Sequence, residues 1–168
     1  MKTARNLLTS ALLIIVSAGA AFGQDGSWTA KADVPDPIAE HGSATIGDTL
    51  YLVGGRVDSA CPATTTDTLA YIISDGTWDR KAPLSIGRHG LAVASEGGKL
   101  YAIGGGTCLS TFPTNEMYDP ATNTWSTKAS MPTPRQGHTV GVVNGILYAI
   151  GGQEQGGLPG VNLTIVEA

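Results

Sequence analysis

Arg88, His89 and Arg135 carry the side chains of this sequence best suited to binding an acidic ligand. A guanidinium group presents a planar fork of donors that matches a carboxylate in a two-point contact. We therefore predict a ligand-binding role for these three residues. The same forks can instead cap the ends of neighbouring strands, so a structural role for the two arginines is the alternative.

The other two histidines, His41 and His138, each stand 13 residues after a tryptophan. This equivalence favours a repeated structural hydrogen bond over a metal site, since a metal needs ligands that converge from different positions. The sequence contains no nucleophile elbow, paired acidic motif, phosphate-cradling loop or metal-ligand spacing. We expect neither a metal nor another cofactor, and we predict no catalytic residue.

The elements that must position these side chains follow from a repeated pattern. A double glycine begins 26 residues after each of the three tryptophans. The tryptophans are Trp28, Trp78 and Trp125, and the glycine pairs are Gly54-Gly55, Gly104-Gly105 and Gly151-Gly152. A period of 47 to 50 residues indicates a repeat architecture, with repeats over about residues 28–77, 78–124 and 125–168.

Each repeat has the local signals of four short antiparallel strands. Asn144-Gly145 separates two β-rich runs and is the strongest two-residue hairpin signal, because both turn residues must accept a positive φ. Gly47-Asp48 and Gly97-Gly98 fill the same turn in the other repeats. The third predicted strand carries Tyr71 or Tyr118, and the fourth carries the tryptophan.

These residues resemble the Kelch repeat, whose hallmarks are a double glycine after an apolar strand, a tyrosine and a tryptophan at fixed separation, and an Arg-x-Gly-His start. Here they are Gly104-Gly105, Tyr118 with Trp125, and "RQGH" at 135–138. The resemblance implies an all-β Kelch-type β-propeller, with about three four-stranded blades of a larger ring of six or seven. The first repeat departs from the pattern, with Ile38 at the arginine position.

Within that architecture the hallmark residues are interpreted as structural. A glycine in a strand often marks a close approach, and we expect the double glycine to make room for an aromatic side chain of the neighbouring blade. The tryptophan is expected to fill the space between blades, while its indole N–H reaches a backbone acceptor.

Cys61 and Cys108 are the two cysteines of the chain, six and three residues after their double glycines. They lie in corresponding loops of adjacent repeats, where an oxidising compartment would allow a disulfide. We predict this disulfide, and free buried thiols are the alternative.

The first 23 residues have the pattern of a secretory signal peptide. Lys2 and Arg5 precede the apolar stretch "ALLIIVSAGAAF", and small residues at Ala21 and Gly23 precede a cleavage site before Gln24. An uncleaved anchor is the alternative, although the apolar stretch is shorter than the roughly 20 residues that span a bilayer. The mature chain, residues 24–168, is therefore expected to be secreted or periplasmic, with no membrane insertion after cleavage.

Composition and charge argue against other classes of partner. The formal net charge is −4, and the 14 acidic residues are scattered without a run of like charge. A nucleic-acid-binding surface or an attraction to an anionic membrane is therefore not indicated.

The predicted function is that of a secreted Kelch module that binds a protein or a glycan through its loop face, without catalysis. Binding residues usually lie on loops of a rigid scaffold, and the longer loops of this chain share one face. The alternative is a carbohydrate-active Kelch enzyme resembling sialic-acid mutarotases or galactose-oxidase-like sugar oxidases. The mutarotase interpretation would require Glu40, His89, Arg88 or Arg135 to point into one pocket.

The sequence ends at "LTIVEA", where a third strand of the last repeat is expected to start. Three blades are fewer than propellers ordinarily have, so we expect an incomplete propeller. Such an array exposes apolar faces and is predicted to be aggregation-prone, oligomeric or unstable on its own.

Overall fold

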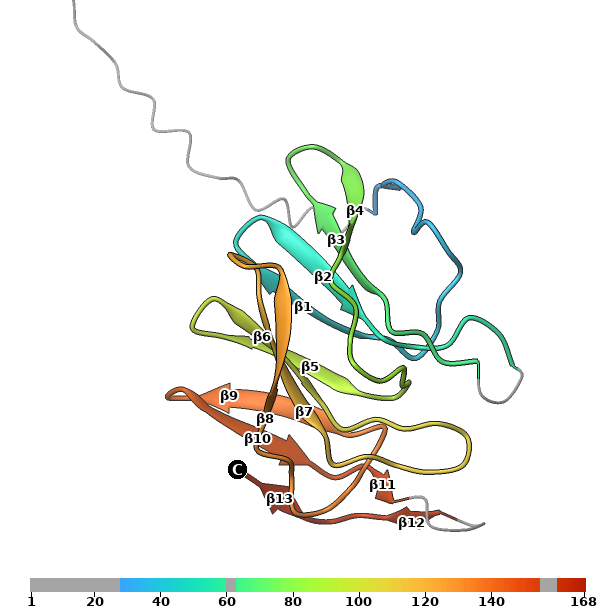
Figure 1. The fold of residues 1–168 in the computed structure, drawn as a ribbon, viewed down its shortest axis with the longest axis vertical. Helices are drawn as coiled ribbons and strands as arrows, with labels where there is room; N and C mark the ends of the chain where they lie inside the picture. Colours follow the sequence, from blue (N-terminus) through green and yellow to red (C-terminus); the bar gives the residue numbers. More distant parts are fainter. Residues whose placement is uncertain (1–27, 60–62, 155–159) are drawn as a thin grey trace, which may run out of the picture. The chain divides into compact units, whose positions relative to one another are not determined.

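The computed structural model describes residues 28–59, 63–154 and 160–168, and the predicted signal peptide lies outside these ranges. The chain divides into an N-terminal unit that ends at Ala30 and a second unit, Lys31–Ala168. All regular structure in the described residues is β-strand (Figure 1). Within the same ranges, no helix is long and apolar enough to cross a membrane.

The described residues of the second unit form three larger sheets and one two-stranded sheet. Sheet 1 has the order β1-β2-β3-β4, sheet 2 the order β5-β6-β7-β8, and sheet 3 the order β9-β10-β13. The strands of sheet 1 are β1 Gly42–Ile46, β2 Thr49–Val53, β3 Thr68–Ile72 and β4 Thr77–Lys81. Those of sheet 2 are β5 Ala92–Glu96, β6 Lys99–Ile103, β7 Asn115–Asp119 and β8 Thr124–Lys128. Sheet 3 contains β9 Thr139–Val143, β10 Ile146–Ile150 and β13 Val166–Glu167, and β11 Gln153–Glu154 pairs with β12 Val161–Asn162.

The predicted strand order is confirmed in the first two repeats, where four antiparallel strands follow one another by hairpins. The predicted first turns are also confirmed. Asn144 and Gly145 have φ values of 51° and 77°, and Gly97 and Gly98 have 55° and 73°. These turns need the left-handed region, which explains why the sequence reuses asparagine and glycine there.

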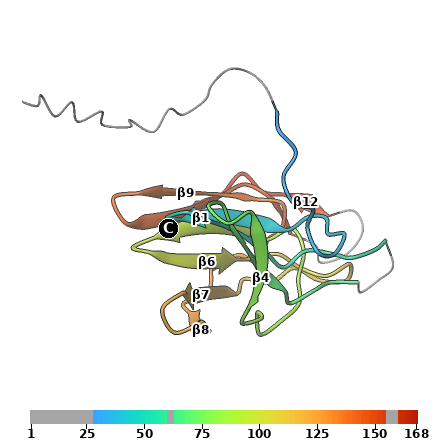
Figure 2. The ribbon, with the colours of Figure 1, turned by 90° about the horizontal axis from the view of Figure 1, so that it is seen from above.

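The sheets contact one another mainly through their first strands, with β1 beside β5 and β5 beside β9 (Figure 1). Seen from above in Figure 2, β1 and β9 lie toward one side of the molecule, and β6, β7 and β8 follow toward the other. Hydrophobic residues of sheets 1 and 2 and of the segment that joins them form the buried core. Its members are Tyr51, Val53, Ala70, Leu84, Leu91, Leu100, Ala102 and Tyr118.

The tryptophans of the fourth strands tie each repeat to the one before it. The indole N–H of Trp125 donates to the Ala82 carbonyl at 2.8 Å, and the indole of Trp78 donates to the Ala32 carbonyl at 3.1 Å. Trp125 also packs against the core. The predicted backbone acceptors are thus confirmed for these two tryptophans.

The double glycines make room for the next repeat, and the group closest to them in both sheets is a backbone carbonyl. A Cβ on Gly104 would lie 2.6 Å from the Arg135 carbonyl oxygen, and Gly105 N–H donates to that same oxygen at 2.8 Å. Gly54 and Gly55 relate to Arg88 in the same way. An aromatic ring of the next repeat, the imidazole of His138, would also lie 2.6 Å from a Cβ on Gly104, whereas the side chain nearest to Gly54 is the aliphatic Leu91. The glycines admit the backbone of the next repeat, and their positive φ values turn the chain toward it.

Gly104→Ala tests this contact against Gly97→Ala. Both glycines have φ near 60°, but a Cβ on Gly97 would meet nothing within 4 Å. We expect Gly97→Ala to cost about 1 kcal/mol for the backbone conformation alone, and Gly104→Ala to cost roughly 3 kcal/mol or more because the neighbouring backbone must move. Urea unfolding of both variants measures the difference. Equal losses would contradict a role for the inter-sheet contact.

Candidate functional site

Arg88 lies in the segment that joins sheet 1 to sheet 2, and its side chain is completely buried. The guanidinium donates to the carbonyls of Gly104 and Ala102, at 2.9 and 3.2 Å, and forms an ion pair with Glu116, Nη1 to Oε1, at 2.6 Å. Burial lowers the pKa of Arg88, and the Glu116 carboxylate opposes that shift. The side chain is therefore held within its own sheet by charge and by hydrogen bonds.

Arg135 repeats this arrangement one sheet later. It is also fully buried, its Nη2 lies 3.0 Å from Glu167 Oε2, and its Nη1 donates to the Gly151 carbonyl at 3.0 Å. Glu167 and Glu116 are equivalent, because each stands opposite the matching alanine of the second strand in its sheet. The ion pair is thus a repeated structural element.

Sheet 1 replaces this pair with apolar residues. The position of Arg88 is taken by Ile38, and the position of Glu116 by Leu69, which stands opposite Leu52 in the register and is 1% exposed. A buried ion pair and a well-packed apolar pair of similar volume can be of similar stability. The replacement of arginine by Ile38 is therefore matched by the replacement of glutamate by Leu69 on β3.

This geometry supports the structural alternative for Arg88 and Arg135. Their guanidinium groups contact carbonyl oxygens and one carboxylate within their own repeats, and neither side chain is exposed. The ligand-binding role predicted for the two arginines has no support in this arrangement. The prediction failed because Arg88 pairs with a buried glutamate, Glu116, which lies 28 residues further along the chain.

His89, in contrast, lines a hollow of about 210 Å³ between the starts of the first strands. Its Nδ1 lies 2.8 Å from Glu40 Oε2, and the other oxygen of Glu40 lies 2.9 Å from Arg56 Nη2. Residues of three successive repeats contribute to the hollow. They are Glu40, His89, Gly90, Gln136, Gly137 and Gln153.

The backbone of Glu40 is held in an unusual conformation. Its φ is 54°, whereas the equivalent residues of the next two repeats are Gly90 and Gly137, with φ of 61° and 63°. Non-glycine residues adopt this region at an energetic cost, and such positions cluster at functional sites. The sequence analysis did not consider the backbone conformation of Glu40. Aligning the repeats could have indicated it, because the equivalent residues Gly90 and Gly137 are both glycines.

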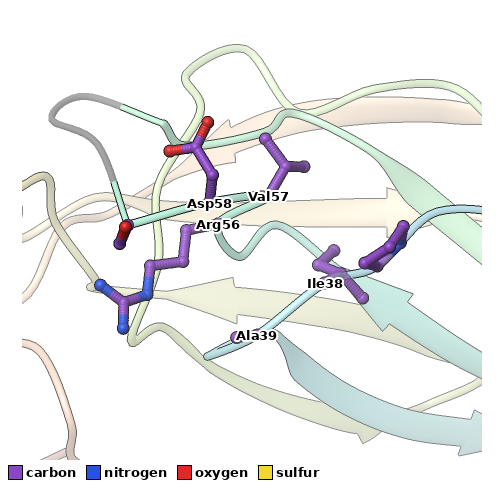
Figure 3. Close-up of a pocket in the computed structure, with 7 residues that line it drawn as sticks. Ile38, Ala39, Arg56, Val57 and Asp58 are labelled. Carbon is purple, nitrogen blue, oxygen red and sulfur yellow. The ribbon is translucent and has the colours of Figure 1, made fainter.

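A second hollow of about 290 Å³ lies next to Arg56. Figure 3 shows the charged side chains of Arg56 and Asp58 toward one side of it, and the apolar Ile38 and Val57 toward the other. Arg56 therefore borders this hollow and also pairs with Glu40 in the first. We call the two hollows together the loop-face site.

The histidines at the shared position differ from the expectation. The Nδ1 atom of His41 and both ring nitrogens of His138 are buried without a hydrogen-bond partner. The repeated structural hydrogen bond was therefore wrong for His138. Burial, and then the nearby Arg135 charge, lower the pKa of His138 to about 4.

Two further predictions concern metals and cysteines. In the described ranges no three His, Cys, Asp or Glu side chains are grouped so as to hold a metal ion. Cys108 is disulfide-bonded. Cys61 lies outside the described residues, so the pairing of these two cysteines stays a prediction.

A double-mutant cycle on Arg88 and Glu116 tests the structural pair. Arg88→Ile or Glu116→Leu alone leaves one buried charge without its partner and should cost about 3–5 kcal/mol. The double variant copies Ile38 and Leu69 of sheet 1, and should lose at least roughly 2 kcal/mol less than the sum of the singles. Chemical unfolding gives all four values. Additive losses would contradict the coupling.

The pH dependence of stability tests the His138 environment. Between pH 6.5 and about 4 the unfolded chain binds a proton that folded His138 rejects. The free energy of unfolding should therefore fall by roughly 3 kcal/mol as the pH is lowered through this window. His138→Leu, which copies Leu91 at the same repeat position, should remove this part of the dependence. Identical pH profiles for the two proteins would refute the assignment.

Comparison with known proteins accounts for the repeats. Residues 87–132 and 134–168 match the Kelch motif. Kelch-like protein 25 of Xenopus tropicalis is 33% identical over 101 residues, which are 55% of this chain and 17% of the relative. Beta-scruin of Limulus polyphemus is 32% identical over 80 residues, 48% of this chain and 8% of the relative. The chain thus matches less than a fifth of either relative.

A solved structure, described as the structure of YjhT, has a similar fold. It superposes with a TM-score of 0.64 and 28% identity, over 74% of this chain and 37% of that one. The predicted all-β Kelch propeller is confirmed, with each sheet corresponding to one blade. By its repeated strands, its double glycines and its match to the motif, the chain belongs to the Kelch-repeat family.

Proposed function

We propose that this chain is an exported, non-catalytic binding module that engages a partner protein through the loop-face site. Kelch repeats suggest a protein-interaction module. The observation that carries the proposal is the convergence of a carboxylate, an imidazole and an amide from three successive blades on one hollow. The backbone of Glu40 supports the proposal. The equivalent positions of the next two repeats are the glycines Gly90 and Gly137, whereas the first repeat keeps a carboxylate at this position despite its positive φ.

The dimensions of the loop-face site favour a protein ligand. Its hollows, of about 210 and 290 Å³, fall below the usual range for small-molecule pockets. They suit single side chains that protrude from a partner surface. The polar hollow around Glu40 can accept a cationic or amide group, and the neighbouring hollow offers Ile38 and Val57 to an apolar one.

A carbohydrate-active site is the second candidate, favoured by the contact between Glu40 and His89 at 2.8 Å. A carboxylate beside an imidazole can supply acid–base chemistry. Of the four residues that this interpretation needs, however, Arg88 and Arg135 are buried in ion pairs elsewhere. The binding module is therefore the function that the geometry supports better.

Glu40→Gly separates function from stability. Glycine relieves the positive φ, so the free energy of unfolding should stay equal or rise by up to about 1 kcal/mol, while partner binding should fall on the order of 10-fold or more. Partners are identified by photo-crosslinking from position 59, which lines the hollow beside Arg56, in extracts of the source organism, and their affinity is then measured for each variant.

Glu96→Gln is the matched control, because Glu96 is the last residue of β5, at the end of the strand opposite to the loop-face site. It should leave the affinity unchanged. Unaltered binding by Glu40→Gly would contradict the proposal. Capture of a glycan in place of a protein, or turnover of a sugar that depends on Glu40 and His89, would favour the second candidate.

A further inference from the structure

The loop-face site contains an ion pair between two exposed side chains. One carboxylate oxygen of Glu40 lies 2.9 Å from Arg56 Nη2, and the other lies 2.8 Å from His89 Nδ1. The side chains of Glu40 and Arg56 are 43% and 40% exposed, so water reaches both partners. Exposed ion pairs of this kind contribute little to stability. The contact between Glu40 and Arg56 can therefore open at little cost.

The side chain of Arg56 is held less firmly than its backbone. The Arg56 N–H donates to the Ala39 carbonyl, and the Ala39 N–H donates to the Arg56 carbonyl, both at 2.9 Å. The guanidinium group, in contrast, has Glu40 as its one ion-pair partner among the described residues. Figure 3 shows this group apart from Ile38 and from the Asp58 carboxylate. The guanidinium can therefore leave Glu40 while the backbone of Arg56 stays in place.

This ion pair is confined to the first of the three repeats. Arg56 directly follows a double glycine, and the equivalent residues are Gly106 and Gln153. Each of the three forms an isolated bridge with the segment before the first strand of its repeat, which confirms the equivalence. Glycine replaces Glu40 in both later repeats. Sheets 2 and 3 are thus built without such a pair, and the repeat architecture does not require it.

The hollow of about 210 Å³ beside Glu40 is rich in groups that accept hydrogen bonds. Glu40 contributes a carboxylate, and Gln136 and Gln153 contribute side-chain amides whose oxygens are acceptors. Among the described residues that line this hollow there is no lysine or arginine. A cationic group that donates several hydrogen bonds therefore suits the hollow better than an anion does.

We propose that the loop-face site binds an arginine side chain of the partner protein, and that Arg56 pairs with Glu40 until this arginine displaces it. The inference rests on the proposed function and names the chemistry of its ligand. The ion pair with Arg56 shows that the Glu40 carboxylate accepts a guanidinium group in this fold. A guanidinium suits such a site better than an ammonium group, because its planar fork of donors reaches two acceptors at once.

Arg56 is therefore a competitor of the ligand. Removal of its side chain would free one oxygen of Glu40 and would take away a positive charge beside it. Both changes strengthen the attraction for a cation. An anionic ligand would be recognised by Arg56 itself, so the same change would weaken its binding. The direction of the effect thus distinguishes the two kinds of partner.

Titration of the full-length protein with N-acetyl-arginine amide tests the proposal. The ring resonances of His89 report binding in NMR spectra, because His89 lines the hollow. The wild type should bind this probe with a Kd on the order of 1 mM, and Arg56→Gln should bind it about 5-fold more tightly. N-acetyl-citrulline amide has a similar shape without the charge, and should bind on the order of 10-fold more weakly than the arginine probe.

Arg80→Gln is the control variant, because Arg80 is another exposed arginine paired with carboxylates, those of Asp36 and Asp67. It removes the same charge from β4 and should leave the affinity for the probe unchanged. Arg56→Gln copies the residue found at the equivalent position of the third repeat. Circular dichroism establishes that each variant is folded, and Arg56→Gly, which copies the second repeat, replaces Arg56→Gln if that variant is not.

The outcomes separate this inference from the proposed function. Equal or weaker binding of the probe by Arg56→Gln, or equal binding of the citrulline probe, would overturn the inference. So would binding of the arginine probe that Glu40→Gly leaves unchanged. Loss of partner binding in Glu40→Gly without any binding of the arginine probe would overturn the inference and leave the proposed function standing. Probe binding that depends on Glu40, in a protein that captures no partner protein from position 59, would support the arginine site and contradict the proposed function.

Discussion

The buried arginine of each crossing segment is the constraint on which the succession of blades depends. The side chain of Arg88 is fixed in sheet 2 by Glu116 and by the carbonyls of Gly104 and Ala102. Its own carbonyl oxygen accepts a hydrogen bond from Gly55 of sheet 1. One residue therefore sets the distance between two sheets, because its two ends are bound to different blades.

The double glycine is the counterpart of this arginine. A side chain at Gly54 or Gly104 would collide with the carbonyl group of the arginine. Each of these glycine pairs therefore leaves space for the backbone of the following repeat and binds it by a hydrogen bond. The tryptophan makes the reverse connection, since Trp125 reaches back to Ala82 in the preceding repeat. Sheets 1 and 2 are thus joined in both directions along the chain, by residues at fixed places in the repeat.

Much of the fold could be predicted from local signals, whereas the site could not. The hairpin at Asn144-Gly145 and the strand order follow from turn chemistry and spacing, which short windows of sequence contain. The burial of Arg88 depends on Glu116, in a different strand, and an arginine in a short motif looks the same whether it faces solvent or a carboxylate. Glu40 was named only for the carbohydrate-active alternative, since its unusual backbone conformation is indicated only by the aligned repeats.

The peptide groups at the starts of the first strands have a consequence for Glu40. Gly137 N–H donates to the Gly90 carbonyl, and Gly90 N–H donates to the Glu40 carbonyl, both at 2.8 Å. Hydrogen bonds in such a row polarise one another, and their dipoles point the same way, as they do in a helix. The N–H end of a row of aligned peptides bears partial positive charge. Glu40 stands at that end, where an acidic side chain is favourably placed.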